Sequence, residues 1–406
     1  MRKRFLGILS IMLAFGLIAA ACGSDDETAT DTTEAPAETD APADTEAPAA
    51  TEAPAATDAP ADTEAPADTE APADATAVKA CLATSSTGVD DQSFNASAWE
   101  GVEAAMAAGV ANDETFFLEP GEVSQYQAVI DQFVDQGCEH IVTVGFDWGE
   151  TTTINAVAQE GITFTIVDNV LSDPETFAPL MLPNVRELVY QTDEAAFAAG
   201  YLAAGMSQTG VLCTYGGGNF PTVSIFMDGF TRGAAHYNEV KGADVAVLGW
   251  DSDAQDGIFT GSFSDMGLAR STADGLIQEG CDILIPVGGA INLPAGDAIN
   301  DTGIDGALIG VDSDAFFAMD QQYAPLWLTT VEKRIADLVT QSISDHAAGT
   351  WEAGSAVGTL SNGGVGLSPY HDWDDRVSDE LKGEVEQLLA DIADGTITAA
   401  FTPVGY

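Results

Sequence analysis

Two segments of this chain repeat the same order of features: a helix end, a glycine, a cysteine and then an apolar strand. QGCEHIVTVG has this order at residues 136–145, and EGCDILIPVGG has it again at residues 279–289. The strands KACLAT and GVLCTY form a second matching pair. Elsewhere, short apolar runs alternate with alanine-rich stretches whose apolar residues recur at helical spacing. Strands that alternate with helices are typical of a doubly wound parallel sheet, so we expect an α/β protein with two duplicated lobes.

The first 22 residues have the pattern of a secretory signal peptide with a lipobox. Basic residues at positions 2–4 precede an apolar run that ends in small residues before Cys22. We therefore expect Cys22 to carry the lipid that anchors the protein on the outer face of the cell membrane. An uncleaved anchor and ordinary secretion are the alternatives. Residues 23–77 are nearly all Ala, Pro, Thr, Asp and Glu, which cannot form a core, so we expect a disordered tether.

The charge of the chain excludes one class of partner. There are 65 Asp and Glu residues against 12 Lys and Arg, which gives a formal net charge of −53. Nucleic-acid binding depends on clustered basic side chains that contact phosphates, so we expect no nucleic-acid partner. Because the acids are spread along the whole chain, we interpret them as a solvated acidic surface.

The four cysteines beyond Cys22 are placed so that two disulfides can form. If each lobe has the flavodoxin-like strand order, its first and third strands are neighbours. Cys81 then lies near Cys138, and Cys213 lies near Cys281. Such pairs form disulfides in an exported protein, and four reduced, buried thiols are the alternative.

Polar and aromatic residues gather directly after the predicted strands. SSTGVDDQSFN, GFDWGE and VDN follow strands of the first half, and the second half has GGGNFPTVSIF, GSFSDMG, VGGAIN and GVDSD. Open parallel sheets bind their ligands at the carboxyl ends of the strands. Carboxylates and amides bind hydroxyls or ring nitrogens, and exposed aromatic rings stack on flat groups. This chemistry fits a sugar or a nucleoside.

A series of nine motifs between residues 80 and 366 resembles the basic membrane protein family of ABC transporter lipoproteins, which includes the purine nucleoside receptors. The motifs are DDQSFN, GFDWGE, QTDEAAFAAGYLAAGM, GGGNFPTVSIFMDGFTRGA, GSFSDMGLA, VGGAINLP, IGVDSD, TTVEKRIAD and GTLSNGGVGL. The resemblance implies a type I periplasmic-binding fold whose two lobes close over a purine nucleoside. It also implies an ABC permease and its ATPase as partners.

We expect the chain to pass between the two lobes three times. Residues 78–190 and 327–350 would form the first lobe, and residues 191–326 and 351–406 would form the second. The three crossings at these boundaries would act as a hinge about which the lobes open and close.

The resemblance also implies which side chains bind the purine base. Phe94 and Phe226 would stack on its two faces, and Asn95 and Asp147 would bond to its polar edge. Asp91, which precedes the same helix as Phe94, belongs to the same expected ligand set.

Four further residues are implied for the ribose end of the ligand. Asp312 and Lys333 would bind the ribose hydroxyls, because charge-assisted hydrogen bonds orient a ligand well. Gly261 and Gly289 would allow the backbone to come close to the ligand.

Some of these residues also have an ordinary structural interpretation. Phe94 and Phe226 could belong to the core, as most phenylalanines do. Asp91 could cap the helix that starts near residue 93. Lys333 could form a surface salt bridge with Glu332 or another nearby acid.

The sequence contains no pattern that indicates catalysis. The four histidines are scattered without metal-ligand spacing, so we expect no metal site and no cofactor. No nucleophile stands beside a histidine in a catalytic motif, so we expect no enzyme. Two alternatives on the same fold are an extracellular sensor or surface adhesin and, less favoured, a nucleoside hydrolase.

Overall fold

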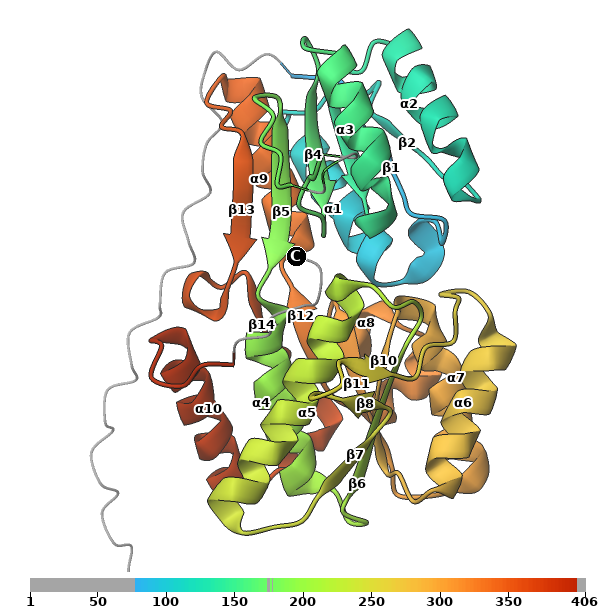
Figure 1. The fold of residues 1–406 in the computed structure, drawn as a ribbon, viewed down its shortest axis with the longest axis vertical. Coiled ribbons are helices and arrows are strands. Elements are labelled where there is room, and N and C mark those ends of the chain that lie inside the picture. The colour runs from blue at the N-terminus through green and yellow to red at the C-terminus, as the bar shows by residue number, and fades with distance from the viewer. Residues whose placement is uncertain (1–76, 174–175, 177, 400–406) are drawn as a thin grey trace, which may run out of the picture. The chain divides into compact units, whose positions relative to one another are not determined.

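The computed structural model describes residues 77–173, 176 and 178–399, which all belong to the unit Asp68–Tyr406. The predicted signal peptide, Cys22 and nearly all of the predicted tether lie outside the described residues. The described chain forms two lobes, each built on one six-stranded sheet (Figure 1). The expectation of a two-lobed α/β fold is thereby confirmed.

The first sheet is wholly parallel and has the strand order β13-β5-β4-β3-β1-β2. Its strands are β1 (Ala80–Ala83), β2 (Phe116–Leu118), β3 (His140–Val144), β4 (Thr163–Val167), β5 (Val185–Tyr190) and β13 (Gly354–Gly358). The central strands β1 and β3 are buried along their whole length. This is expected for a parallel sheet that is covered by helices on both faces.

The second sheet has the order β14-β12-β11-β10-β6-β7, and only its edge strand β14 is antiparallel. Its strands are β6 (Val211–Gly216), β7 (Ala246–Leu248), β10 (Ile283–Val287), β11 (Ala307–Asp312), β12 (Trp327–Lys333) and β14 (Val365–Leu367). A short hairpin outside this sheet consists of β8 (Trp250–Asp251) and β9 (Asp256–Gly257).

Helices cover both faces of each sheet (Figure 1). The helices of the first lobe are α1 (Phe94–Ala107), α2 (Tyr126–Asp135), α3 (Gly149–Ala158) and α9 (Ile335–Ala348). Those of the second lobe are α4 (Thr192–Met206), α5 (Pro221–Lys241), α6 (Met266–Gln278), α7 (Asn292–Thr302), the single turn α8 (Ala315–Ala318) and α10 (Asp379–Ala393). Helices α1 and α9 pack together, as do α6 and α7.

Helices α4 and α5 pack with their backbones in contact because each contributes a glycine. A Cβ at Gly200 would lie 1.9 Å from the carbonyl oxygen of Phe230, and a Cβ at Gly233 would lie 1.8 Å from that of Phe197. Real Cβ atoms essentially never come so close to another atom. The α4–α5 contact therefore requires glycine at both positions. Helix α5 in turn carries part of the cleft described below.

The two lobes carry equivalent disulfides. Cys81 on β1 is bonded to Cys138, two residues before β3, and Cys213 on β6 is bonded to Cys281, two residues before β10. In both sheets these strands are neighbours, as β1 pairs with β3 and β6 with β10. These are the pairs expected from the flavodoxin-like strand order.

Two of the three crossings between the lobes differ from the expected boundaries. The first crossing follows β5 at Tyr190, as expected. However, residues 327–333 (β12) pair with β11 in the second sheet, and residues 354–358 (β13) pair with β5 in the first. The later crossings therefore lie near Arg334 and Thr359, so the expected boundaries at 326/327 and 350/351 are corrected.

The crossings are joined to neighbouring backbone by hydrogen bonds. The N–H of Gln191 donates to the carbonyl oxygen of Gly358 at 2.8 Å, and the N–H of Arg334 donates to that of Gly364 at 3.0 Å. The three segments thus form one connected hinge.

Candidate ligand-binding cleft

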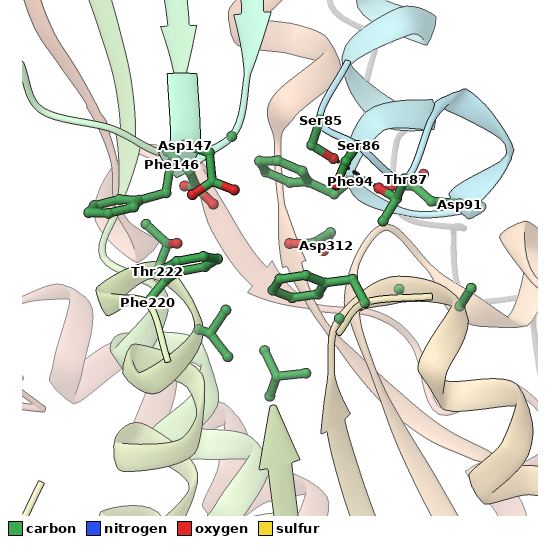
Figure 2. A pocket seen from close by; sticks show the side chains of 18 of the residues that line it. Ser85, Ser86, Thr87, Asp91, Phe94, Phe146, Asp147, Phe220, Thr222 and Asp312 are labelled. Atoms are coloured by element: carbon green, nitrogen blue, oxygen red, sulfur yellow. Dashed lines mark hydrogen bonds between the residues drawn. The ribbon is translucent and has the colours of Figure 1, made fainter. Parts of the chain in front are cut away.

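A cavity of about 110 Å³ lies between the carboxyl ends of the two sheets (Figure 2). Its walls come from the segments that follow β1, β3 and β4 in the first lobe and β6, β9 and β10 in the second. Asp312 and Lys333, at the ends of β11 and β12, complete them. A single water needs about 10–15 Å³ by the same measure, so the cavity has room for a small molecule.

Most of the predicted ligand residues line this cavity. The seven that do are Asp91, Phe94, Asp147, Phe226, Gly289, Asp312 and Lys333. Asn95 and Gly261 are not among the residues that line it. The complete lining of the cavity comes from eight separate segments of the chain, which lie together only in the folded protein.

Asp91 caps helix α1, as its structural interpretation required. Its carboxylate accepts hydrogen bonds from three backbone N–H groups at the start of α1, at 2.9–3.1 Å. Burial raises the pKa of Asp91 above its ordinary value, and the N–H donors oppose this shift. Asp91 therefore borders the cavity with a carboxylate whose oxygens are already bonded.

Asn95 lies behind the wall of the cavity and is fully buried. Its Nδ2 lies 2.7 Å from Asp91 Oδ2 and 2.9 Å from both Ser85 Oγ and Thr87 Oγ1. Its Oδ1 accepts from the N–H of Ser85 at 2.8 Å. All polar atoms of Asn95 are bonded within the lobe, so direct contact with a ligand, which we expected, is corrected to a supporting role. Asn95 holds the loop that contributes residues 85–87 to the cavity.

Aromatic rings occupy both sides of the cavity (Figure 2). Phe146 of the first lobe stacks on Phe220 of the second at a centroid distance of 5.4 Å, and Phe220 stacks on Phe263 at 6.0 Å. A ring held between two others needs a centroid spacing of about 7 Å, twice the usual contact distance. Phe146 and Phe220 thus contact each other and leave no space for a further ring between them.

Phe94 and Phe226, the predicted stacking pair, both lie next to the ammonium of Lys333. The Nζ atom is 5.6 Å from the ring centroid of Phe94 and 4.8 Å from that of Phe226. Phe226 is almost completely buried, whereas Phe94 is partly exposed. The two rings therefore belong to the cavity wall and to the hydrophobic core at once.

Lys333 lies between two aspartates at the base of the cleft. Its Nζ is 2.5 Å from Asp168 Oδ2 and 3.6 Å from Asp312 Oδ1. All three residues are at most 6 % exposed, which excludes the surface salt bridge as the role of Lys333. Burial would lower the pKa of Lys333, but the two carboxylates together raise it, so the ammonium stays charged. Burial raises the pKa of both aspartates, which Lys333 opposes.

Asp168 and Asp312 occupy equivalent places in the two lobes. Asp168 directly follows β4, Asp312 ends β11, and both have a left-handed backbone with φ values of 60° and 70°. This conformation is uncommon for residues other than glycine, and strain of this kind concentrates at functional sites. Asp312 was predicted as a ligand residue, whereas Asp168 was noted only as a strand-end carboxylate.

Ser93 and Gly289 bring the two lobes into contact beside the cavity. The hydroxyl of Ser93 in the first lobe lies 2.9 Å from the carbonyl oxygen of Val311 and 3.1 Å from Asp312 Oδ2 in the second. A Cβ at Gly289 of the second lobe would lie 3.3 Å from the carbonyl oxygen of Asp91. Gly289 thus allows the lobes to come close to each other, in addition to lining the cavity.

Asp147 and Gly261, the two remaining expected residues, and the neighbouring Trp148 differ in their surroundings. Asp147 lies exposed on the wall, next to Phe146 (Figure 2), and desolvation raises its pKa. Gly261 has φ of 75° and no atom within 4 Å of a Cβ, so it has no close backbone approach in this structure. Trp148 turns into the core, where it stacks on Tyr126 at 3.8 Å and donates to the carbonyl oxygen of Thr84.

Sequence reasoning did not single out several residues that line the cavity. These are Ser85, Ser86, Thr87, Gly145, Phe220, Thr222, Val223, Phe263, Val287, Gly288 and Ala290, whereas Phe146 and Asp168 were noted only as residues that follow strands. Nearly all of them lie in the segments after strands, so their position at strand ends was the available signal. That signal does not say which way each side chain points.

The described residues form neither a metal-binding cluster nor a membrane-spanning helix. Residues 77–399, apart from the three undescribed positions at 174–177, contain no group of three or more His, Cys, Asp or Glu side chains arranged to hold a metal ion. None of the helices in this part of the chain is long and apolar enough to cross a membrane.

The family profile and two similar proteins all indicate the same family. The profile of the Bmp family, described as ABC transporter substrate-binding protein PnrA-like, matches residues 78–399. The chain is 27% identical over 337 residues to the ABC transporter nucleoside-binding protein BmpA of Lactococcus lactis subsp. cremoris, which covers 80% of this chain and 89% of that protein. It is 25% identical to basic membrane protein A of Borreliella burgdorferi, with 78% and 86% of the two chains covered.

Solved structures agree at the level of the fold. A solute-binding protein of an ABC transporter system from Aeropyrum pernix matches with a TM-score of 0.69 and 22% identity, covering 80% of this chain and 93% of the other. A solute-binding protein from Conexibacter woesei matches with a TM-score of 0.60 and 23% identity, covering 80% and 99%.

Proposed function

This chain belongs to the Bmp family of PnrA-like ABC transporter substrate-binding proteins, and from this premise we propose that its ligand is a purine nucleoside. As a member, it is a substrate-binding protein and not an enzyme. Such a protein works on the outer side of the membrane, where it captures a small ligand and passes it to a permease and its ATPase.

One observation carries the nucleoside proposal: a single cavity brings aromatic rings together with a buried cation and carboxylates. Phe94 and Phe226 lie within 6 Å of the same ammonium that contacts Asp312. A flat, uncharged base gains about 1–3 kcal/mol from each aromatic ring on which it stacks. Ribose hydroxyls both donate and accept, so they suit an ammonium beside a carboxylate. The name of the Lactococcus relative supports the same ligand class.

We assign the base to the aromatic end of the cavity. Phe94 and Phe226 provide rings for stacking, and Asp147 provides an exposed carboxylate for the polar edge of the base. Binding of a ring beside Phe220 would require that residue to move away from Phe146, because the two rings are in contact. Opening of the lobes at the hinge provides this movement.

We assign the ribose to Lys333 and Asp312 at the base of the cleft. The cleft holds one ammonium against four carboxylates, those of Asp91, Asp147, Asp168 and Asp312. A strongly anionic ligand would meet net repulsion there. An uncharged sugar does not.

Cys22 is the proposed lipid attachment site, on the evidence of the preceding signal pattern. A lipid at this position would hold the folded lobes near the membrane through residues 23–77. Mass spectrometry of the protein extracted from its native membrane tests this proposal. An N-terminus other than an acylated Cys22 would contradict it.

Calorimetric titration tests the ligand. Inosine, guanosine and adenosine are compared with uridine, hypoxanthine and ribose, using residues 77–406 of the chain. We expect at least one purine nucleoside to bind at least 100-fold more tightly than its free base or free ribose, because each lacks half of the contacts. Binding of ribose as tightly as any nucleoside would contradict the proposal.

A further inference from the structure

A second cavity, of about 270 Å³, lies on the hinge side of Lys333. It shares Asp168, Thr222 and Lys333 with the cleft, so the two cavities meet at these side chains. The remaining walls come from the first hinge crossing, from the segment after β4 and from the start of α5. We call it the hinge cavity.

Buried polar residues line the hinge cavity, and the hydroxyl of one of them has no partner among the described residues. Asp168, Tyr190, Thr192 and Lys333 are each at most 6 % exposed. The hydroxyl of Tyr190 makes no hydrogen bond to any residue in the described part of the chain. A buried hydroxyl without a partner is costly, and such groups usually have a ligand or water as partner. Tyr190 therefore supplies an unpaired, buried hydroxyl at the wall of this cavity.

The rest of the lining sets the chemistry of that occupant. Val170, Val189 and Ile225 form an apolar wall. Asp168 offers acceptors, and the ammonium of Lys333 has three donors but only two carboxylate partners. Because two carboxylates already surround the single cation, the cavity has no positive charge to balance a phosphate. It suits an uncharged group with a polar atom and an apolar end.

We propose that the hinge cavity binds an uncharged substituent on the sugar of the ligand, so that the protein accepts 5′-extended purine nucleosides and rejects nucleotides. This inference rests on the nucleoside assignment above. Lys333 belongs to both cavities, so a sugar bound to it lies at their junction. The ring hydroxyls are engaged by Lys333 and Asp312, and the exocyclic 5′ carbon is the position of ribose from which a substituent extends.

Titration with three adenosine compounds tests this inference. They are adenosine, adenosine-5′-N-ethylcarboxamide and adenosine 5′-monophosphate. The carboxamide has a polar amide that can bond to Tyr190 and an ethyl group that can contact the apolar wall. We expect it to bind about tenfold more tightly than adenosine, as one additional buried hydrogen bond and an apolar contact imply. The monophosphate is expected to bind at least 100-fold more weakly than adenosine.

Two variants locate the effect. Tyr190→Phe should reduce the advantage of the carboxamide over adenosine to less than about threefold without lowering the melting temperature, because the hydroxyl has no partner to lose. Val170→Phe should weaken carboxamide binding at least tenfold more than adenosine binding, because it fills only the hinge cavity. Val123→Phe, at a half-exposed position that lines neither cavity, is the matched control.

Failure of this inference can be told apart from failure of the proposed function. If adenosine binds but the carboxamide has less than a threefold advantage, or the monophosphate binds as well as adenosine, the role of the hinge cavity is wrong and the nucleoside assignment stands. An advantage that survives Tyr190→Phe also overturns it. If no purine nucleoside binds, the assignment fails and this inference fails with it.

Discussion

Lys333 determines the electrostatics of the cleft at the level of single residues. It is the only basic side chain among the described residues that line the main cavity. Three rings, those of Phe94, Tyr190 and Phe226, lie within 6 Å of its ammonium, so little water remains to solvate the charge. Asp168 and Asp312 supply the stabilisation instead, and each of them depends on Lys333 in return.

Replacing Lys333 by methionine should destabilise the fold in a pH-dependent way. Removing one member of a buried ion cluster costs about 3–5 kcal/mol, because uncompensated charge stays buried. The aspartates, whose folded pKa values already exceed the ordinary value, would then be raised further. Because the folded pKa is raised, the free-energy cost of burying the ionised aspartates is complete above that pKa. This cost decreases as the pH falls through that pKa. Urea unfolding between pH 8 and pH 5 should therefore show that the loss in free energy of unfolding, relative to the unchanged protein, decreases toward pH 5.

The surface variant Lys382→Met serves as the control for that measurement. Lys382 pairs with the exposed Asp374, and exposed pairs contribute little to stability. A deficit of Lys333→Met that stays constant with pH would contradict the proposed coupling to the aspartates.

Individual strands and helices depend on contacts that their own sequences do not reveal. The sequence pattern did not predict β5 and β12, because VRELVY and WLTTVEK each place a basic and an acidic residue side by side. Tertiary partners compensate for these charges. Arg186 on β5 pairs with Asp345 of α9 at 2.6 Å and stacks on Trp351, while Lys333 on β12 pairs with Asp168.

The close α4–α5 contact predicts that Gly200 cannot be replaced without loss of stability. Gly200→Ala should destabilise the protein by about 3 kcal/mol, because its Cβ would overlap a backbone oxygen of α5 that cannot move alone. Gly275→Ala in α6 is the matched control, since no atom lies within 4 Å of its Cβ, and it should stabilise by up to about 1 kcal/mol. Equal melting temperatures for the two variants would show that the helices do not pack as described.

The complete lobes act on each other through the cleft and the hinge. Ser93 bonds across the cleft to Val311 and Asp312, and Gly289 lies against Asp91. These contacts hold the lobes together next to the cavity without involving the ligand. A substitution at this contact should therefore affect closure of the whole molecule more than the chemistry of the site.

Gly289→Val tests closure. Its side chain would enter the space between the lobes, so we expect ligand binding to weaken about tenfold and the ligand-induced decrease in the radius of gyration to disappear. Small-angle X-ray scattering with and without the tightest nucleoside measures this. Gly303→Val is the control, because Gly303 has a similar φ of 69° but no neighbour within 4 Å of its Cβ. Similar behaviour of the two variants would assign the effect to backbone strain alone.

The sequence by itself determined the α/β class, the two duplicated lobes and the cysteine pairs, because periodicity and repetition are local properties that any reader of the chain can find. The family resemblance implied nine ligand residues, and seven of them line one cavity, where the strand ends of the two sheets meet. Only the tertiary structure decided that Asn95 supports the cavity wall and that Asp168 pairs with Lys333. It also decided that β12 belongs to the second sheet and β13 to the first, opposite to the prediction. Those outcomes depend on which distant groups satisfy a buried charge or an open sheet edge, and such pairings have no signature in the local sequence.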